Sequence, residues 1–424
     1  MNGKNSARKG SRMRIAMVSE HASPLAVLGG VDAGGQNVHV AELSAALARR
    51  GHEVLVYTRR DSTEPPERVQ TPDGYTVVHV PAGPPEALPK DELLTHMPAF
   101  GRFLAEQWRD EPPDVAHAHF WMSGIATLRA ARRCDVPTVQ TFHALGVVKR
   151  RHQGVRDTSP PARLRLERSV ARTADWVTAT CTDEVFELVR LGRPRSRISV
   201  IPCGVDLARF CPDTVPAARR GPRRIVSVGR LVPRKGFDIL IRAMTAVPDA
   251  ELFIVGGPDA RGFAKDPEAQ RLSALTARLG VSDRVRLCGS VSRSQMPAVL
   301  RRADVVACTP WYEPFGIVPV EAMACGVPVL ATAVGGMLDT VVDGMTGLLV
   351  PPKDAPACAA ALNWMLTDPA RLAEWGAAGR HRARFRYSWD RIASDTLKVY
   401  QRLIPASRPV SRTATVLAPG RQSG

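Results

Sequence analysis

Short apolar runs alternate with amphipathic segments along the first half of the chain. Each run has the length of a buried strand, and the segments between them repeat apolar residues at helical spacing. The pattern predicts strands at 14–19, 53–58, 76–80, 114–118, 137–141 and 175–180, and helices at 36–50, 91–109, 121–133, 160–173 and 183–191. Strand–helix–strand repetition of this kind favours a parallel sheet with helices on both faces.

The same pattern restarts after a break at 203–221 that is rich in Gly and Pro. Strands are predicted at 224–228, 250–255, 284–287, 304–308 and 327–331, with helices at 235–246, 266–279, 293–302 and 318–325. We therefore expect an α/β protein with an N-terminal Rossmann-like domain at 13–205 and a C-terminal one at 206–387. A last helix at 388–404 is expected to cross back to the first domain, and the tails 1–12 and 405–424 are expected to be disordered. Ligands of such sheets bind beyond the carboxyl ends of the strands, which predicts a site in the cleft between the domains.

The length of 424 residues suits two domains of about 200 residues each. The formal net charge is +17, but three stretches carry most of it: +5 in 1–14, +6 in 149–172 and +4 in 401–424. The remaining body is near neutral and aromatic residues make up only 5%, which argues against a nucleic-acid binder. Local basic surfaces suit phosphate-bearing ligands or an anionic membrane face.

Eight cysteines occur without a Cys-x-x-Cys pair or zinc-type spacing, so we expect buried thiols in a reducing compartment. No signal peptide and no apolar run of transmembrane length is evident. We expect a cytoplasmic protein, in which the basic segments are the place for any peripheral contact with the inner face of the membrane.

Two loops at predicted strand-to-helix junctions have the composition of anion sites. Residues 29–39 (Gly-Gly-Val-Asp-Ala-Gly-Gly-Gln-Asn-Val-His) precede a helix, and glycines let backbone N–H groups approach a ligand there. The spacing is not Gly-x-Gly-x-x-Gly, which counts against a nicotinamide or flavin enzyme. In the second half, Arg230 and Lys235 flank the start of a helix, an arrangement that fits a diphosphate.

The segment 313–332 places two carboxylates, Glu313 and Glu321, on either side of a Phe-Gly turn in apolar surroundings. Such carboxylates need hydrogen-bond donors, and sugar hydroxyls supply them. A retaining hydrolase also uses paired carboxylates, but both must face one glycosidic bond.

This segment resembles the glutamate-x7-glutamate motif of retaining, nucleotide-sugar-dependent glycosyltransferases of family 4, which have the GT-B fold of two Rossmann-like domains. The resemblance covers nearly the whole chain apart from the tails. Four further segments, 29–40, 80–90, 117–124 and 141–146, are similar to two branches of that family. One branch is the inositol-phosphate N-acetylglucosaminyltransferase of mycothiol biosynthesis, and the other comprises sucrose synthase and sucrose-phosphate synthase. Phe120 stands where the mycothiol branch has a tyrosine, and Ala144 where a threonine or serine is common.

The resemblance implies roles for individual residues. Arg230 and Lys235 would hold the nucleotide diphosphate, and Glu321 the ribose hydroxyls. Glu313 would hold the donor sugar, and with Arg230, Lys235 and His143 it forms the implied catalytic set. The other implied donor contacts are Gly34, Gly35, Phe315, Gly316 and Ile317. The implied acceptor contacts are Asn37, Lys90, Phe120 and His143, with Arg163 and Arg165 as further candidates. His117 and His119 are expected to be structural.

We expect transfer of a hexose or N-acetylhexosamine, from UDP in the nearest branches, to a hydroxyl of a sugar, sugar phosphate or inositol phosphate. No nucleophile stands out, so a front-face path is favoured in which the donor phosphate takes the acceptor proton. No Asp-x-Asp motif is present, and we expect neither a metal nor a cofactor to be required. The alternatives are a GDP-mannose-dependent transferase with a lipid-linked acceptor, an epimerase or phosphorylase on the same frame, and a non-catalytic nucleotide-sugar binder.

Overall fold

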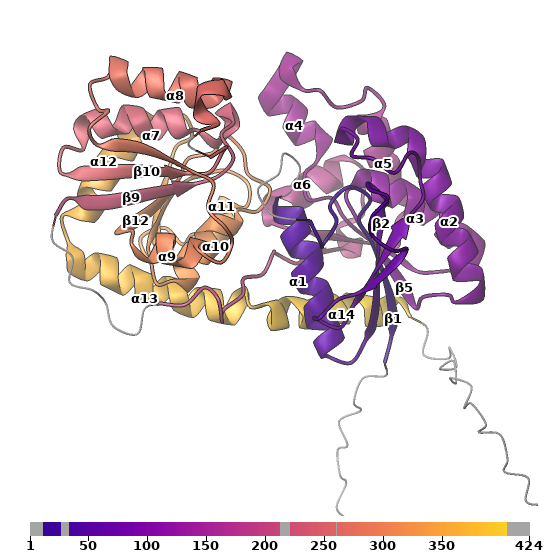
Figure 1. Ribbon diagram of the computed structural model, residues 1–424. Helices are drawn as coiled ribbons and strands as arrows, with labels where there is room; N and C mark the ends of the chain where they lie inside the picture. Colours follow the sequence, from indigo (N-terminus) through magenta and orange to yellow (C-terminus); the bar gives the residue numbers. More distant parts are fainter. Residues whose placement is uncertain (1–11, 27–33, 213–220, 260, 405–424) are drawn as a thin grey trace, which may run out of the picture.

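The computed structural model describes residues 12–26, 34–212, 221–259 and 261–404. Two lobes stand side by side in Figure 1, each with a twisted sheet between helices. We call them the N-terminal and the C-terminal lobe, after the order of their sheets along the chain. The expectations of disorder for 1–12 and 405–424 fall outside the described residues, apart from Arg12.

Eight described strands form the sheet of the N-terminal lobe, and all neighbours pair in parallel except β3 with β4. In spatial order they are β3 (Arg68–Gln70), β4 (Thr76–Val80), β2 (Glu53–Arg59), β1 (Arg14–Val18), β5 (Val115–His119), β6 (Thr138–Thr141), β7 (Trp176–Ala179) and β8 (Ile198–Val200). The helices are α1 (Gly35–Arg49), α2 (Met97–Asp110), α3 (Trp121–Cys134), α4 (Gly146–Gln153), α5 (Arg163–Thr173) and α6 (Thr182–Arg190), with 3-10 turns η1 (Lys90–His96), η2 (Gly154–Arg156) and η3 (Arg195–Arg197). The central strand β1 pairs with β2 and β5 and is almost fully buried, because helices cover both faces of the sheet.

Six described strands form the sheet of the C-terminal lobe, and all of its pairings are parallel. In spatial order they are β11 (Val285–Gly289), β10 (Ala250–Val255), β9 (Arg223–Val228), β12 (Val305–Cys308), β13 (Val329–Thr332) and β14 (Gly347–Val350). The helices are α7 (Phe237–Ala243), α8 (Pro267–Arg278), α9 (Met296–Arg301), α10 (Ile317–Ala324), α11 (Met337–Thr340), α12 (Ala355–Leu366) and α13 (Pro369–Arg386), with η4 (Pro233–Lys235), η5 (Met244–Ala246) and η6 (Phe263–Lys265). Short strands with apolar residues on both faces are what a parallel sheet buried between helices requires.

The last helix, α14 (Trp389–Leu403), leaves the C-terminal lobe and passes under the N-terminal one, as Figure 1 shows. Trp389 and Tyr400 belong to one buried cluster with residues of β1, α1 and α10, so the apolar core is continuous from lobe to lobe. A side chain at Gly204 would collide with the Trp389 ring, since an added Cβ would lie 2.5 Å from it. The hydroxyl of Tyr400 contacts His117 Nδ1 at 2.7 Å. The predicted return of the last helix to the first domain is confirmed.

The predicted α/β class and two-lobed architecture are confirmed, and the differences are local. The expected helix at 160–173 begins only at Arg163, and the unpredicted helix α4 lies before it. The expected helix at 235–246 is split, because Gly236 adopts a left-handed conformation between η4 and α7. The short strands β3, β8 and β14 were not predicted, because three or four residues give too little periodicity.

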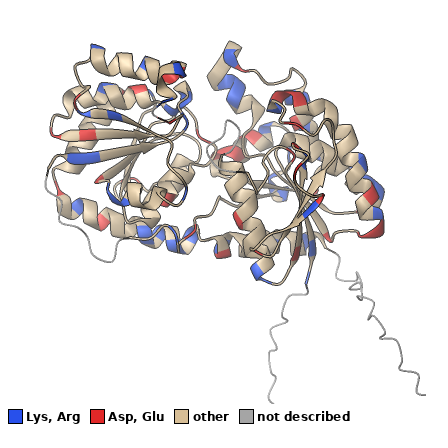
Figure 2. Ribbon diagram, in the orientation of Figure 1, with Lys and Arg blue, Asp and Glu red and all other residues tan. Residues whose placement is uncertain are grey.

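Charged side chains of both signs are distributed over both lobes in Figure 2.

None of the eight cysteines forms a disulfide. Five are buried, Cys134 and Cys211 are half-buried, and Cys288 is exposed, contrary to the expectation of buried thiols throughout. Among the described residues, no helix is both long enough and apolar enough to span a bilayer.

Substituting Tyr400→Phe is expected to lower the free energy of unfolding by about 1–3 kcal/mol, since His117 Nδ1 would lose its partner inside the core. Urea unfolding followed by tryptophan fluorescence measures the change. The matched control is Tyr75→Phe, because the Tyr75 hydroxyl makes no hydrogen bond to the described residues. Equal stability of the two variants would contradict the structural role of the Tyr400 hydroxyl.

Candidate active site

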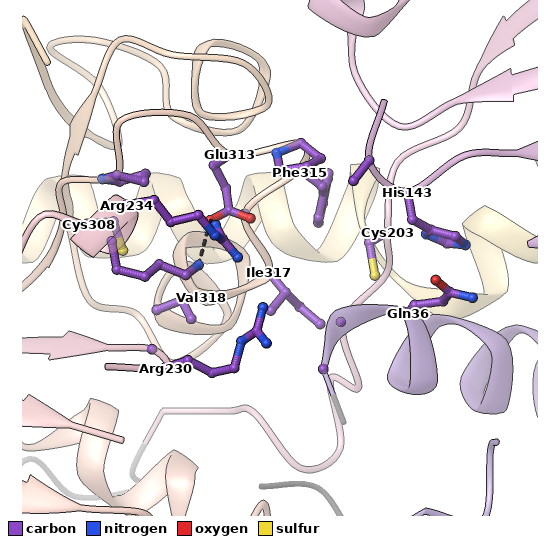
Figure 3. Close-up of a pocket in the computed structure, with 18 of the residues that line it drawn as sticks. Gln36, His143, Cys203, Arg230, Arg234, Cys308, Glu313, Phe315, Ile317 and Val318 are labelled. Atoms are coloured by element: carbon purple, nitrogen blue, oxygen red, sulfur yellow. Dashed lines mark hydrogen bonds and ion pairs between the residues drawn. The ribbon is translucent and has the colours of Figure 1, made fainter. Parts of the chain in front are cut away.

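A cavity of about 360 Å³ lies between the lobes, at the carboxyl ends of strands from both sheets. Twelve of the predicted site residues line it: Gly34, Gly35, Asn37, Lys90, Phe120, His143, Arg230, Lys235, Glu313, Phe315, Gly316 and Ile317. Glu321 and the further candidates Arg163 and Arg165 do not. Figure 3 shows Arg230, Arg234 and Glu313 on one wall, opposite Gln36 and His143 on the other. We call this cavity the interlobe pocket.

The C-terminal wall of the pocket carries an ion pair at its centre. Lys235 Nζ donates to Glu313 Oε2 at 2.5 Å, and Arg234 Nη1 lies 3.8 Å from the same oxygen. Lys235 ends η4 and Glu313 lies in the loop after β12, so two adjacent strand ends supply the pair. Gly236 makes the approach possible, since a Cβ there would lie 2.0 Å from the carbonyl oxygen of Thr309.

The charge of Glu313 is set by its neighbours. Burial by itself would raise the pKa of the Glu313 carboxyl, but Lys235, Arg234 and Arg230 together hold that pKa below its ordinary value. The carboxylate is therefore ionised at neutral pH, and the cations around it carry a net positive charge. A basic corner of this kind, recessed in a pocket, suits a polyanionic group such as a diphosphate.

Two glycines fix the loop that carries Glu313. A Cβ on Gly335 would lie 2.2 Å from the backbone oxygen of Glu313, and Gly336 N–H donates to that oxygen at 3.0 Å. Gly316 has φ +85° and begins α10, which leaves Phe315 and Ile317 against the pocket. The backbone after Glu313 thus reaches the pocket in a fixed conformation.

Glu321 is held apart from the pocket. It lies in α10, is buried, and accepts a hydrogen bond from Arg293 Nη1 at 3.0 Å on Oε1. Burial raises the pKa of Glu321 to about 7, although Arg293 opposes that shift. Oε2 makes no hydrogen bond to the described residues.

The N-terminal wall begins at the start of α1. Gly34 and Gly35 line the pocket there, while Gly29 and Gly30 lie outside the described residues. Asn37 Oδ1 accepts from Gly34 N–H at 3.0 Å, and its Nδ2 donates to Ser23 O at 3.0 Å. Asn37 therefore holds the chain on both sides of the glycine-rich loop. A cavity beside unpaired N–H groups of a helix start favours an anion.

Four histidines meet beside this wall, three of them deeply buried: His39, His117 and His119, with His143 reaching the pocket. His143 has φ +60°, and its Nε2 lies 2.9 Å from His119 Nδ1. Burial lowers the pKa of His39 to about 4 and that of His117 to about 3, and burial together with the other histidines lowers the pKa of His119 and His143 well below the usual value. The cluster is uncharged at neutral pH. His119 thus contacts a pocket residue directly.

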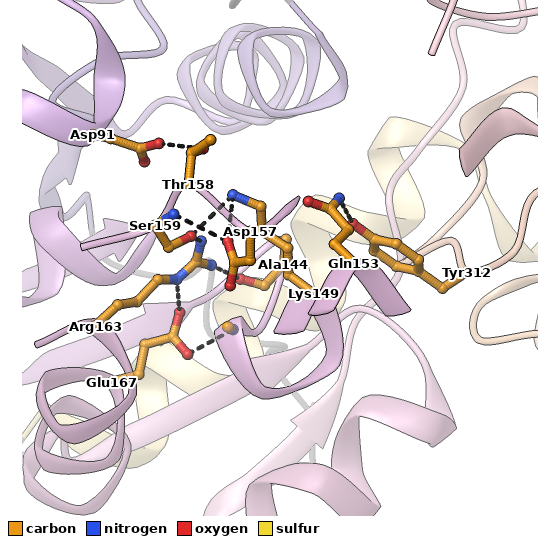
Figure 4. Close-up of polar contacts among 11 residues, drawn as sticks. Asp91, Ala144, Lys149, Gln153, Asp157, Thr158, Ser159, Arg163, Glu167 and Tyr312 are labelled. Atoms are coloured by element: carbon orange, nitrogen blue, oxygen red, sulfur yellow. Dashed lines mark hydrogen bonds and ion pairs between the residues drawn. The ribbon is translucent and has the colours of Figure 1, made fainter. Parts of the chain in front are cut away.

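The floor beside Phe120 is basic. Lys90 Nζ lies 5.6 Å from the centre of the Phe120 ring and the Arg163 guanidinium 5.2 Å from it. Arg163 is buried and contacts Glu167, Ser159 and the backbone oxygen of Ala144, as Figure 4 shows. It does not line the pocket, and Arg165 is exposed on α5. Two residues of the basic run thus connect α4 with the start of α5: Arg163 contacts the loop before α4, and Lys149 contacts Asp157 and Ser159 in the segment between the helices.

Several pocket residues were not singled out from the sequence. Arg234 lies between Arg230 and Lys235 in the sequence, so the basic segment 229–236 could have predicted its place in the pocket. Gln36, whose Nε2 donates to the His119 backbone oxygen at 3.3 Å, lies in the first turn of α1, and His21 lies in the loop after β1. No group of three or more His, Cys, Asp or Glu side chains suited to a metal ion occurs in the described part of the chain.

Comparisons with known proteins agree with this geometry. Residues 33–209 match the model of Glycosyltransferase Family 4, and residues 214–382 match that of Glycosyl transferases group 1. The D-inositol 3-phosphate glycosyltransferase of Xylanimonas cellulosilytica is 41% identical over 406 residues, which is 91% of this chain and 96% of the relative. The chain belongs to glycosyltransferase family 4. It is a glycosyltransferase with the GT-B fold, and both predictions are confirmed.

Two further similarities extend over most of the molecule. The D-inositol 3-phosphate glycosyltransferase of Mycolicibacterium smegmatis is 40% identical over 92% of this chain and 91% of its own length. The solved structure of the sucrose-phosphate synthase of Thermosynechococcus elongatus superposes with a TM-score of 0.84 at 33% identity, covering 93% of this glycosyltransferase and all of that chain. Both branches named from the sequence are therefore represented among these relatives.

The pH dependence of the unfolding free energy of the Glu313→Gln variant tests whether Glu313 is ionised in its pair with Lys235. The pKa of Glu313 is lower in the folded than in the unfolded protein, so its ionisation stabilises the fold above the unfolded pKa, and this contribution is lost as pH falls below about 4.5. The difference in unfolding free energy between the wild-type protein and E313Q should therefore shrink between pH 7 and pH 3.5, as measured by urea unfolding. Glu106→Gln, an exposed position on α2, is the control. A difference that is constant with pH would contradict the ionised pair.

Proposed function

We propose that this glycosyltransferase moves a hexose or N-acetylhexosamine from UDP to a hydroxyl of a small phosphorylated acceptor, such as an inositol phosphate or a sugar phosphate, with retention of configuration. The main support for the proposal is the interlobe pocket, in which the cationic wall faces the wall formed by the start of α1, the histidine cluster and Phe120. The names of the relatives support the acceptor class, because both of the curated relatives described above are D-inositol 3-phosphate glycosyltransferases.

The cationic wall is proposed as the donor site. Arg230 and Lys235 would hold the diphosphate, and Glu313 with the backbone at Phe315 and Gly316 would hold the transferred sugar. Glu321 would take the ribose hydroxyls through Oε2, the oxygen that Arg293 leaves unused. Support comes from the net positive charge around Glu313 and from the fixed loop that carries it.

The N-terminal wall is proposed as the acceptor site. Lys90 lines the pocket and lies over the Phe120 ring, so its charge favours an anionic acceptor at that end of the pocket. Asn37 and His143 would offer polar groups to the acceptor, and the Phe120 ring would offer it a flat surface. Because His143 is uncharged, it can accept or donate a hydrogen bond to a sugar hydroxyl without repelling the cations.

The reaction follows from these positions. The acceptor oxygen forms a bond with the anomeric carbon as the bond to the donor phosphate breaks, and the electron pair of that bond leaves with the diphosphate. The departing phosphate oxygen takes the hydroxyl proton. Arg230 and Lys235 stabilise the charge that develops on the leaving group, which is the step at which preorganised cations contribute most. Movement of the lobes toward each other would exclude water from the anomeric carbon.

Other donors, acceptors and reactions predict different products. A thermal-shift panel of UDP-, GDP- and ADP-sugars identifies the donor, and mass detection against D-inositol 3-phosphate, sugar phosphates and lipid-linked sugars identifies the acceptor. The proposal predicts stabilisation by UDP-sugars and release of UDP only when a phosphorylated acceptor is present. GDP-mannose binding with a lipid-linked acceptor, or conversion of the donor without an acceptor, would instead support the lipid-directed transferase or the epimerase.

Lys235→Ala is expected to lower kcat/KM by about 100- to 1,000-fold, because one preorganised cation is lost from the transition state. Initial rates of UDP release measure the effect. Lys398→Ala is the matched control, since Lys398 is exposed on α14 and outside the pocket lining. Circular dichroism verifies that the K235A variant is folded. Wild-type turnover by folded K235A would overturn the assignment of the donor wall.

Removing divalent metal ions is expected to leave transfer unchanged, because Arg230 and Lys235 neutralise the diphosphate in this proposal. Rates are compared before and after treatment with excess EDTA, with Mg²⁺ added back in a third sample. Loss of activity with EDTA and its recovery with Mg²⁺ would show that the cation pair does not suffice.

A further inference from the structure

The residues on either side of Glu313 contact the N-terminal lobe, although Glu313 itself belongs to the C-terminal one. The hydroxyl of Tyr312 accepts a hydrogen bond at 2.6 Å from Gln153 Nε2, at the end of α4. The backbone oxygen of Pro314 lies 3.3 Å from Thr180 Oγ1, just beyond the end of β7. Figure 4 shows Gln153 and Tyr312 meeting from different lobes. The N-terminal lobe therefore touches the C-terminal wall of the pocket at the loop that carries Glu313.

Of these two contacts, the one to Tyr312 is the stronger. The Thr180 hydroxyl has one hydrogen to donate, and its oxygen lies closer to Glu184 Oε2, at 2.8 Å, than to the Pro314 oxygen. Tyr312 makes a second contact with α4, because the ring of His152 stacks on its ring with 4.9 Å between the centroids. We call the contacts of His152 and Gln153 with Tyr312 the interlobe clasp.

Helix α4 is firmly attached to the N-terminal lobe. At its start, the N–H of Gly146 donates to Oε2 of the buried Glu167 at 2.7 Å. Near its middle, Lys149 Nζ donates to Ser159 Oγ at 2.9 Å and lies 2.9 Å from Asp157 Oδ1. Figure 4 shows these contacts together with the one between Gln153 and Tyr312. The end of α4, which forms the clasp, is thus held in place by the lobe behind it.

In the C-terminal lobe, Tyr312 reaches the ion pair of the pocket. The guanidinium of Arg234 lies 5.4 Å from the centre of the Tyr312 ring, within the range of a cation–π contact, and its Nη1 lies 3.8 Å from Glu313 Oε2. The backbone N–H of Trp311 donates to the Arg234 backbone oxygen at 2.8 Å. Because Tyr312 directly precedes Glu313 in the chain, a displacement of Tyr312 acts on both Arg234 and the Glu313 loop.

We propose that Tyr312 is a positioning residue, through which the interlobe clasp sets the place of Glu313 relative to the transferred sugar. The inference rests on the proposed function, in which Glu313 holds that sugar. It adds that the lobe proposed to bind the acceptor also takes part in aligning the donor. Loss of the clasp should therefore impair attack by the acceptor more than attack by water, since water needs no alignment with a second bound substrate.

Substitutions on both sides of the clasp test this role. Tyr312→Phe removes only the hydroxyl and Gln153→Ala removes its partner, so each should lower kcat for transfer by about 2- to 10-fold, the effect of one hydrogen bond. The variant with both substitutions should be no slower than the slower single variant, because the same contact is lost. Gln153→Glu should retain more activity than Gln153→Ala, since its carboxylate can accept from the Tyr312 hydroxyl. Gln401→Ala, at an exposed position on α14, is the control.

The kinetic readouts separate positioning from a general loss of folded enzyme. Transfer from a UDP-sugar to D-inositol 3-phosphate or a sugar phosphate gives kcat and KM, and the slow hydrolysis of the UDP-sugar is measured without acceptor. The KM for the UDP-sugar should stay close to that of the wild-type enzyme, because Arg230 and Lys235 keep the proposed diphosphate contacts. The ratio of hydrolysis to transfer should rise when the clasp is lost. A loss of folded enzyme would lower both rates equally.

Hydrogen exchange tests the clasp without any substrate. In mass spectrometry, the amides of 149–154 and 311–316 should exchange faster in Tyr312→Phe and Gln153→Ala than in the wild-type protein and in Gln401→Ala. Exchange in α12, which packs against α7, should not change.

The combined results either support or overturn the inference. A rise of hydrolysis relative to transfer, non-additive losses and faster exchange at both segments support it. Equal losses of transfer and hydrolysis, losses that multiply in the double variant, or wild-type kcat in both single variants overturn it while the proposed function stands. It is also overturned if Q153E is no more active than Q153A, or if exchange is unchanged at either segment. If the wild-type protein transfers sugar to no phosphorylated acceptor, the proposed function fails and the positioning role fails with it.

Discussion

The site depends on keeping a buried carboxylate ionised next to two cations. Burial raises the pKa of Glu313, and Lys235 opposes that shift most strongly, while Lys235 would be costly to bury without Glu313. Their meeting requires glycines at two positions, because side chains at Gly236 and Gly335 would collide with backbone. The ion pair therefore fixes the loops after β9 and β12 together, and it shapes the wall that is proposed to bind the donor.

The opposite wall uses neutral groups. Burial keeps the cluster of His39, His117, His119 and His143 uncharged, so that these four side chains add no positive charge to the pocket. The helix α14 connects the two walls, since its Tyr400 contacts His117 and its core residues pack against both lobes.

Much of this was predictable from sequence. The alternation of strands and helices predicted both sheets, and the segments around Lys235 and Glu313 predicted that these residues meet in the pocket, because they lie at strand ends where parallel sheets bind ligands. Three features were not predictable in this way. Helix α4 follows a histidine with positive φ and has too few apolar residues for a clear period. The pairing of Glu321 with Arg293 joins residues 28 positions apart. The contact of Glu20 with Ser123 spans 103 positions, and no motif connects these two residues.

Retention of configuration is the outcome proposed for this site, because the departing phosphate oxygen is proposed to take the proton of the attacking hydroxyl, which places the acceptor on the face of the leaving group. The direct measurement is the anomeric configuration of the product, determined by NMR after transfer from an α-configured UDP-sugar. The account predicts an α-linked product. A β-linked product would contradict it.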